Sequence, residues 1–175
     1  MIKKILVPTD GSDHANKAID LAADLADKYK ADIVVLHVLM NHVPVYELKV
    51  LAERYNAGQE TINKLDEVSE AMFSASTAGY GGPVTLPAPV ETVQAVADAI
   101  CSDALKRVGS KYAGKARASI VGGAAADSIL EIAGAEGTDM IVMGSRGLGK
   151  LAGVLMGSVS HKVAHHAECT CVTVK

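Results

Sequence analysis

Apolar and polar positions change along the chain in blocks typical of strands and helices that follow one another. Residues 4–8 form a short apolar run that a Pro-Thr-Asp-Gly-Ser sequence of turn-forming residues stops. The next residues place apolar side chains at helical spacing, with Ser12 or Asp13 as the candidate N-cap. Residues 32–39 are almost continuously apolar, which predicts a strand buried on both faces. The opening of the chain therefore predicts a strand–helix–strand unit with a right-handed crossover.

The same alternation continues through the second half of the chain, from about residue 91 to the end. The expected helices lie at 91–108, 127–135 and around His161, and the expected strands at 116–121, 140–143 and 169–174. Strands that alternate with helices in this way predict an α/β fold, a doubly wound parallel sheet of five strands with helices on both faces.

The stretch at about 41–90 interrupts the alternation and is interpreted as an insertion. Its first part has apolar residues at helical spacing, and Gly58 is expected to break that helix. Residues 79–89 are rich in glycine and proline, which indicates a turn-rich connector. Because some fifty residues of this composition would bury little core alone, we expect one domain over residues 1–175.

Composition excludes several classes of function. The net charge of −3 and the aromatic content of 3% provide neither the basic surface nor the stacking rings that nucleic-acid binding needs. The longest apolar run is far shorter than the roughly 20 residues of a membrane span, and the N-terminus has no signal-peptide pattern. The cysteines are three, an odd number, which favours reduced thiols over a disulfide framework. We expect a cytoplasmic protein.

The segment with the most chemical information is Gly144-Ser-Arg-Gly-Leu-Gly-Lys150, which continues to Gly157-Ser-Val-Ser160. It follows a predicted strand and ends where a helix begins. Glycines allow a ligand to approach the backbone closely, and a helix N-terminus offers N–H groups and a positive dipole end that favour phosphate. Ser158 and Ser160 add hydroxyl groups. These features predict an anion site for phosphate. Gly144-x4-Gly149-Lys150 also matches most of a P-loop, but Leu151 replaces the Ser or Thr that would hold magnesium, so we reject that interpretation.

Together with other segments, this pattern resembles the ATP-binding subgroup of the universal stress protein family. That subgroup shows Gly-x2-Gly-x9-Gly-Ser/Thr, which Gly144, Gly147, Gly157 and Ser158 match at every position. The resemblance covers residues 2–38 and about 91–175, and not the insertion. The other segments that carry it are Ile5–Ser12, Leu36-His37-Val38, Gly122, Ile129 and Asp139–Ser145.

The resemblance implies an adenine nucleotide alpha hydrolase-like topology with ATP across the carboxyl ends of the first and fourth strands. It implies that Mg²⁺, which keeps most of its water ligands, bridges phosphate oxygens. The implied nucleotide-binding residues are Pro8, Thr9 and Asp10 on the ribose and base side, Val38 against the adenine, Met143 and Gly144 near the ribose and phosphates, and Gly147, Gly157, Ser158, Val159 and Ser160 as a cradle of N–H groups and hydroxyls around the phosphates. Taken singly, Asp10 also reads as a turn residue and Ser158 as a helix cap.

Other candidate sites have less support, and we expect no catalytic and no metal-binding residues. His161 and His165 lie four apart on one helical face, which permits a zinc pair, but His166 faces elsewhere and no carboxylate or cysteine motif completes a set. The chain has no Gly-x-Ser-x-Gly motif, and Ser145 has no evident His or Asp partner. Arg146 and Lys150 read equally as phosphate contacts and as solvated loop charges.

The expected function is that of a nucleotide-dependent regulatory switch in the stress response. The resemblance implies a homodimer that pairs through the C-terminal strand at 169–174, and other protein partners remain unidentified. A slow ATP hydrolase of the same fold is one alternative, although the chain lacks the Ser-Gly-Gly-x-Asp-Ser and His-x-Gly-His motifs of enzymatic relatives. A nucleotide-free dimeric interaction module is the other alternative, and the intact glycine pattern argues against it.

Overall fold

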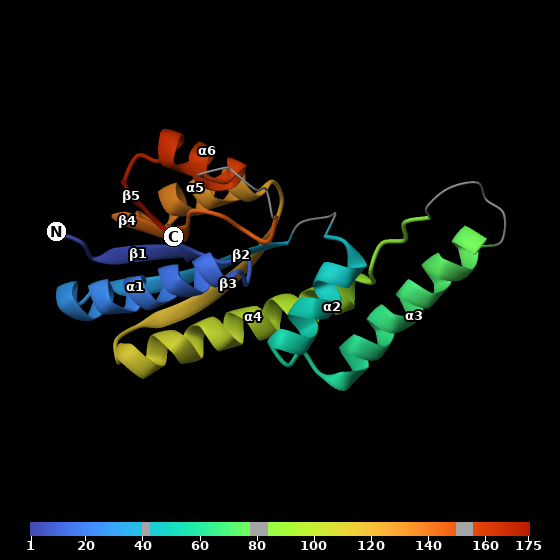
Figure 1. Ribbon diagram of the computed structural model, residues 1–175. Helices are drawn as coiled ribbons and strands as arrows, with labels where there is room; N and C mark the ends of the chain where they lie inside the picture. Colours follow the sequence, from blue (N-terminus) through green and yellow to red (C-terminus); the bar gives the residue numbers. More distant parts are fainter. Residues whose placement is uncertain (40–42, 78–83, 150–155) are drawn as a thin grey trace. The chain divides into compact units, whose positions relative to one another are not determined.

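The computed structural model describes residues 1–39, 43–77, 84–149 and 156–175 (Figure 1). The chain divides into two compact units. The first comprises Met1–Met40 and Ile100–Lys175, and the second comprises Asn41–Ala99. The single-domain organisation stays a prediction, and the two units are described separately below.

The first unit is a five-stranded sheet in the order β3-β2-β1-β4-β5, and every neighbouring pair is parallel. The predicted doubly wound sheet is therefore confirmed, with boundaries that differ from the expected ones by three residues or fewer, as is usual at fraying helix ends. Its elements are β1 (Lys4–Pro8), α1 (Asp13–Tyr29), β2 (Asp32–Leu39), the later turns of α4 (Val90–Lys111), β3 (Ala116–Gly122), α5 (Ala125–Ala135), β4 (Met140–Gly144), α6 (Ser158–His166) and β5 (Thr170–Val174).

Helices cover both faces of this sheet, as the strands' unbroken apolar sequences require (Figure 1). In β1, Ile5 and Val7 pack with α1 and the later turns of α4, and Leu6 packs with α5 and α6 on the opposite face. The same alternation follows β2 and β4, because successive side chains of a strand point to opposite faces. Alanines form most of the α1 face that meets the sheet, so this helix lies close to the strands.

Helix α1 begins immediately after the turn that ends β1. The Ser12 side chain caps it by accepting a hydrogen bond from the Ala15 N–H at 3.2 Å, so Ser12, and not Asp13, is the N-cap. The helix ends at Lys30, a left-handed C-cap with φ of 55°. The cap fixes the first turn of α1 at the carboxyl end of β1.

The second unit contains α2 (Val45–Arg54), α3 (Gln59–Thr77) and the first turns of α4. Gly58 lies between α2 and α3 with φ of 93°, which confirms the predicted break. Leu48, Leu51 and Leu65 are buried, and a Lys49–Asp66 ion pair joins α2 to α3. Residues 78–83 of the predicted connector lie outside the described residues, and residues 84–89 are neither helix nor strand.

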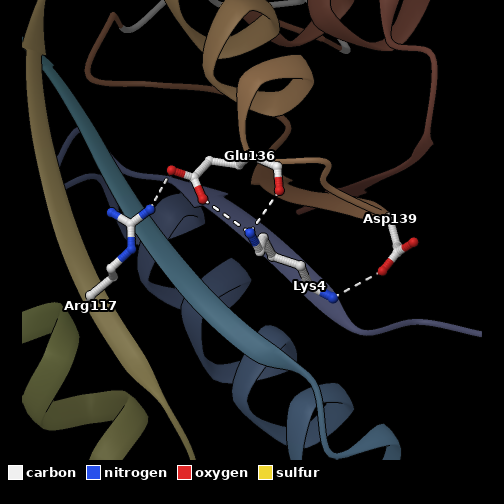
Figure 2. A network of polar contacts seen from close by, with 4 residues as sticks. All are labelled: Lys4, Arg117, Glu136 and Asp139. Atoms are coloured by element: carbon white, nitrogen blue, oxygen red, sulfur yellow. Dashed lines mark hydrogen bonds and ion pairs between the residues drawn. The ribbon is translucent and has the colours of Figure 1, made fainter.

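A polar network joins three parts of the first unit at the amino end of the sheet (Figure 2). The Glu136 carboxylate accepts hydrogen bonds from Arg117 on β3 and, at 3.1 Å, from the Lys4 ammonium on β1. Asp139 accepts hydrogen bonds from the backbone N–H groups of Lys3 and Lys4 at 2.7 and 3.0 Å. Arg117 and Lys4 lower the pKa of Glu136, and the two backbone donors lower the pKa of Asp139. Both carboxylates are therefore stabilised in their charged forms by folding.

This network predicts a loss of stability in acid. Because folding lowers both pKa values, the stabilisation is complete above the unfolded-state values, about 4.3 for Glu and 3.9 for Asp, and is lost as the pH falls below them. We expect the urea midpoint of the wild type to fall between pH 6 and pH 3, and to fall less in a Glu136→Gln/Asp139→Asn double variant. Glu131→Gln, at an exposed position of α5, is the control and should follow the wild type. Parallel pH profiles for all three proteins would contradict the prediction.

Candidate functional site

The loops that leave β1 and β4 meet at the carboxyl edge of the sheet. The strand order places β1 beside β4, and the chain runs from β1 to β2 on one side and from β4 to β5 on the other. This arrangement is the switch point at which doubly wound sheets bind ligands. Pro8, Thr9 and Asp10 end one strand, and Met143 and Gly144 end the other, so the structure brings these five predicted residues to the same place.

Gly144 lies directly against the first turn of α1. A Cβ atom at this position would stand 2.9 Å from the Ala15 nitrogen and 2.9 Å from both the carbonyl carbon and the Cβ of His14. Real Cβ atoms do not approach backbone this closely, so glycine is required by packing alone. The close approach lets the loop after β4 cross over to the loop after β1.

Asp10 connects these two loops through its carboxylate. One oxygen accepts a hydrogen bond from the Ser12 N–H at 3.0 Å and shapes the turn into α1. The other accepts from the Leu148 N–H at 3.0 Å. Gly147 also packs against this carboxylate, where a Cβ atom would collide with Oδ2. Asp10 thus has the predicted turn role and, in addition, holds the glycine-rich loop in place.

Two further contacts across the loops were not evident from the sequence. His14 Nδ1 lies 3.2 Å from the hydroxyl of Ser145, and the Ser12 hydroxyl donates to the Arg146 carbonyl at 3.4 Å. The Ser145 residue is only 2% exposed. The expectation that Ser145 has no His partner was therefore wrong. Because its hydroxyl is buried, however, this pair does not present a nucleophile to a substrate.

Helix α6 is joined to the same glycine-rich loop at its N-terminus. The Ser145 carbonyl accepts hydrogen bonds from the Gly157 N–H and from the Ser160 hydroxyl, both at 2.8 Å. Ser160 is 2% exposed, so its hydroxyl is used inside the protein and is turned away from solvent. Ser158 is exposed, and Val159 packs into the core beside α5. Gly157 is the N-cap and supplies no capping side chain. An anion could therefore meet the first-turn N–H groups and the Ser158 hydroxyl.

The end of β2 forms another wall of this region. Val38 packs against the core beside α5, and its neighbour His37 faces the β1 loop. His37 Nδ1 lies 2.9 Å from the Thr9 carbonyl and must carry the proton, since a carbonyl oxygen can only accept. Burial lowers the pKa of His37, against smaller opposing effects of the Thr9 hydrogen bond and the Asp10 charge. The neutral His37 ring therefore holds the Thr9 carbonyl by a hydrogen bond, and Thr9 directly precedes Asp10.

Arg146, Cys169 and Cys171 are further residues of the first unit with charged or reactive side chains. Arg146 is exposed, and Lys150 and Leu151 of the rejected P-loop lie outside the described residues. Cys169 and Cys171 pack against the core beside α6, where burial raises the pKa of both thiols. Within the described residues, no three His, Cys, Asp or Glu side chains are grouped to hold a metal ion. Nor does any helix in that part of the chain have the length and apolar character to span a membrane.

The fold is that of a doubly wound α/β protein. The loops after β1 and β4 meet at its switch point, where backbone N–H groups form most of the candidate site. The sequence profile of the Universal stress protein family matches residues 1–175, and the chain belongs to this family. A universal stress protein of Thermus aquaticus is 30% identical over 175 residues, and YxiE of Bacillus subtilis is 29% identical over 181 residues. Both alignments span the full length of both proteins.

Solved structures of the family share this fold. A universal stress protein crystallised with cAMP matches 99% of this chain and 96% of its own, with a TM-score of 0.60 and 22% identity. The universal stress protein of Archaeoglobus fulgidus in complex with dAMP matches all of both chains, with a TM-score of 0.60 and 18% identity. These likenesses confirm the nucleotide-binding alpha hydrolase-like fold.

Gly144 offers a direct test of the packing that holds the two loops together. We expect Gly144→Ala to lower the free energy of unfolding by about 1–3 kcal/mol, because the new methyl group would overlap the backbone of α1. Gly149→Ala, in the same loop but with no described residue within 4 Å of the added atom, is the matched control and should change stability little. Urea denaturation of the three proteins measures the difference. Equal stability of both variants would contradict the required close approach.

Proposed function

We propose that this protein binds ATP at the switch point and acts as a nucleotide-dependent regulatory switch in the stress response. The backbone conformation and the free space at Gly157 are the main support for the proposal. Its φ and ψ of −70° and 160° are accessible to any residue. A Cβ atom there would stand 3.5 to 3.6 Å from its neighbours, which is ordinary van der Waals distance. Among the described residues nothing requires a glycine at this position, whereas a ligand seated on the backbone would.

The first turn of α6 supplies the complementary chemistry. The N-cap has no side chain, so the N–H groups of Ser158, Val159 and Ser160 face the helix N-terminus without a side-chain cap. A phosphate placed there would meet backbone donors and the positive end of the helix dipole. In the proposal Gly147 and Gly157 flank this phosphate, and the exposed hydroxyl of Ser158 donates to it.

The rest of the nucleotide would extend toward β1 and β2. In the proposal Pro8, Thr9 and Asp10 lie on the ribose and base side, Val38 contacts the adenine, and Met143 and Gly144 lie near the ribose and phosphates. The cAMP and dAMP bound by the two structural relatives support an adenine nucleotide. Mg²⁺ would be held by phosphate oxygens and water, since it binds with few protein ligands.

A switch agrees better with this site than rapid catalysis. The Ser145 hydroxyl is buried against His14, and Asp10 already accepts two backbone hydrogen bonds. Neither group is placed to activate a water molecule beside the phosphates. Binding of ATP would instead compete with, or reinforce, the contacts that order the loops, and so alter the surface that partners meet.

Calorimetry with ATP and Mg²⁺ tests the nucleotide site. We expect micromolar binding by the wild type and at least a tenfold loss in Gly157→Glu, whose carboxylate would occupy and repel the phosphate site. Gly134→Glu is the matched control, because it adds the same charge at an exposed position of α5 with nothing within 4 Å.

The controls separate the possible outcomes of this experiment. Equal affinity of the two glutamate variants would contradict a phosphate at α6, and absence of binding by all three would favour the nucleotide-free interaction module. Parallel titrations with AMP and cAMP identify the preferred nucleotide. ATP turnover in the same samples should stay below about 1 per second, the low end of ordinary enzymes.

We also propose a homodimer that pairs through residues 169–174 in the cytoplasm. In the described sheet β5 is an edge strand, with β4 as its neighbour on one side. An edge strand presents a row of backbone donors and acceptors that a second copy can pair with. We expect sedimentation velocity at micromolar concentration to show a species of twice the 18.1 kDa chain mass. A single monomeric species at that concentration would contradict the dimer.

A further inference from the structure

The second half of α3 extends beyond the helix on which its first half packs. Helix α3 has 19 residues and α2 has 10, so at 1.5 Å per residue their lengths are about 28 and 15 Å. The short turn at 55–58 joins the two helices, which pack on each other, and the last turns of α3 lie clear of α2 (Figure 1). Thr61 and Leu65 are the buried residues of α3, and both lie in its first half. Its second half therefore lacks a packing partner among the described residues of this unit.

Apolar residues nevertheless continue along this second half. Val68 and Met72 follow the buried Leu65 by three and seven residues, so they lie on the same side of the helix and prolong the stripe that packs against α2. Both side chains are only partly buried. Phe73 lies at the edge of the same stripe and is 71% exposed. We call Val68, Met72 and Phe73 the outer face of α3.

The outer face has little to stabilise it in the described protein. Residues 66–77 include no buried side chain, although helices in proteins gain most of their stability by packing an apolar face. The described part of the connector contacts the last turn, where the Val84 N–H donates to the Ser76 hydroxyl at 3.4 Å, and it leaves Phe73 exposed. An exposed apolar patch of this kind is typical of an interaction site.

The charges near the outer face are negative. Glu67 and Glu70 lie one turn apart and are both exposed, and Glu70 lies one turn before Phe73. The third acidic residue of this half, Asp66, already pairs with Lys49 of α2. Glu70 has no ion-pair partner among the residues that the structure describes. A partner that brings both apolar and positively charged side chains would therefore complement this surface.

We propose that the outer face of α3 binds a basic amphipathic helix of a partner protein. Val68, Met72 and Phe73 pack against the apolar face of that helix. Glu67 and Glu70 pair with Lys or Arg side chains along its edge. The contact buries the exposed phenyl ring and supplies the packing that the last turns of α3 lack.

The charges argue against other occupants of this face. The connector and the start of α4 cannot supply the cations, because residues 65–105 contain no Lys, Arg or His. A second copy of the chain would bring its own Glu67 and Glu70 close to the same acids, and like charges across an interface weaken binding. Helices that lie on membranes carry Lys and Arg, which attract anionic lipids, whereas this segment carries acids.

Fluorescence anisotropy with a labelled synthetic peptide tests this surface on the full chain, without nucleotide. The probe is an amphipathic helix of about 18 residues, or five turns, with leucine on one face and lysine on the other. One comparison peptide has glutamate in place of lysine, and the other has the same leucine and lysine content in shuffled order. We expect saturable binding of the probe and at least about tenfold weaker binding of both comparison peptides.

Variants of apolar residues locate the site. Met72→Ser/Phe73→Ser should weaken binding of the probe by about tenfold or more, because it removes the apolar contacts. Tyr46→Ser/Val50→Ser is the matched control, since these side chains are 66% and 56% exposed and lie one turn apart on α2. Its affinity should stay within about threefold of the wild type.

Variants of acidic residues test the charge complementarity. Glu67→Gln/Glu70→Gln should weaken binding of the probe and make it less sensitive to salt, because screening acts on the ion pairs that this variant removes. Glu91→Gln/Asp98→Asn neutralises two exposed acids of α4 in the same unit and should keep the wild-type affinity and salt dependence.

Each alternative result overturns the proposal. Absence of saturable binding excludes the surface, and equal binding of the shuffled peptide would indicate general attraction of cations to an acidic protein. Equal binding of the glutamate peptide would show that the charges have no part in it. An unchanged affinity of Met72→Ser/Phe73→Ser would place the peptide elsewhere.

Sedimentation of the apolar variant distinguishes a partner helix from a second copy. Met72→Ser/Phe73→Ser should sediment as the wild type does, and its conversion to a smaller species would assign the outer face to contacts between copies. Because the peptide titrations contain no nucleotide, their outcome is independent of whether ATP binds at the switch point.

Discussion

The close approach of the first turn of α1 to Gly144 determines how the rest of the site is arranged. With no side chain at the end of β4, the backbone of that strand passes directly beside His14 and Ala15. The loop after β4 can then reach Asp10, whose carboxylate accepts the Leu148 N–H. A larger residue at position 144 would push the two loops apart and break these contacts together. One steric constraint thus positions two segments that are far apart in the sequence.

Backbone groups extend this arrangement from α1 to α6. The Ser145 carbonyl accepts from Gly157 and Ser160, while the Ser145 hydroxyl meets His14 on the other side. Ser145 is therefore the junction between the two helices that flank the site. Because Ser160 uses its hydroxyl at this junction, the cradle available to an anion consists of backbone N–H groups and Ser158. In the proposed site such a cradle would recognise phosphate by geometry and would not depend on a charged side chain.

The sequence predicted the strands well because burial on both faces leaves a signal in consecutive residues. Residues 32–39 are buried on both faces, so an unbroken apolar run was a sufficient signal. The glycine pattern likewise located the turn after β4. The contacts that shape the site were not predictable in this way. His14 and Ser145 are 131 residues apart, and Asp10 and Leu148 are 138 apart, and one sequence shows only that each could form a hydrogen bond. The inward direction of the Ser160 hydroxyl was also not predictable, because it depends on the Ser145 carbonyl, which lies 15 residues earlier in the chain.

Residues that the fold does not require are the best indicators of function in this protein. The family's glycine pattern contains both kinds. Gly144 is fixed by packing, whereas Gly157 has room for a side chain among the described residues and lacks one. The same reasoning applies around α6, which buries Ser160 and Val163 and leaves His161 and His165 outside the core. Its N-terminus lies at the edge of that core, where the phosphate of the proposed nucleotide would bind.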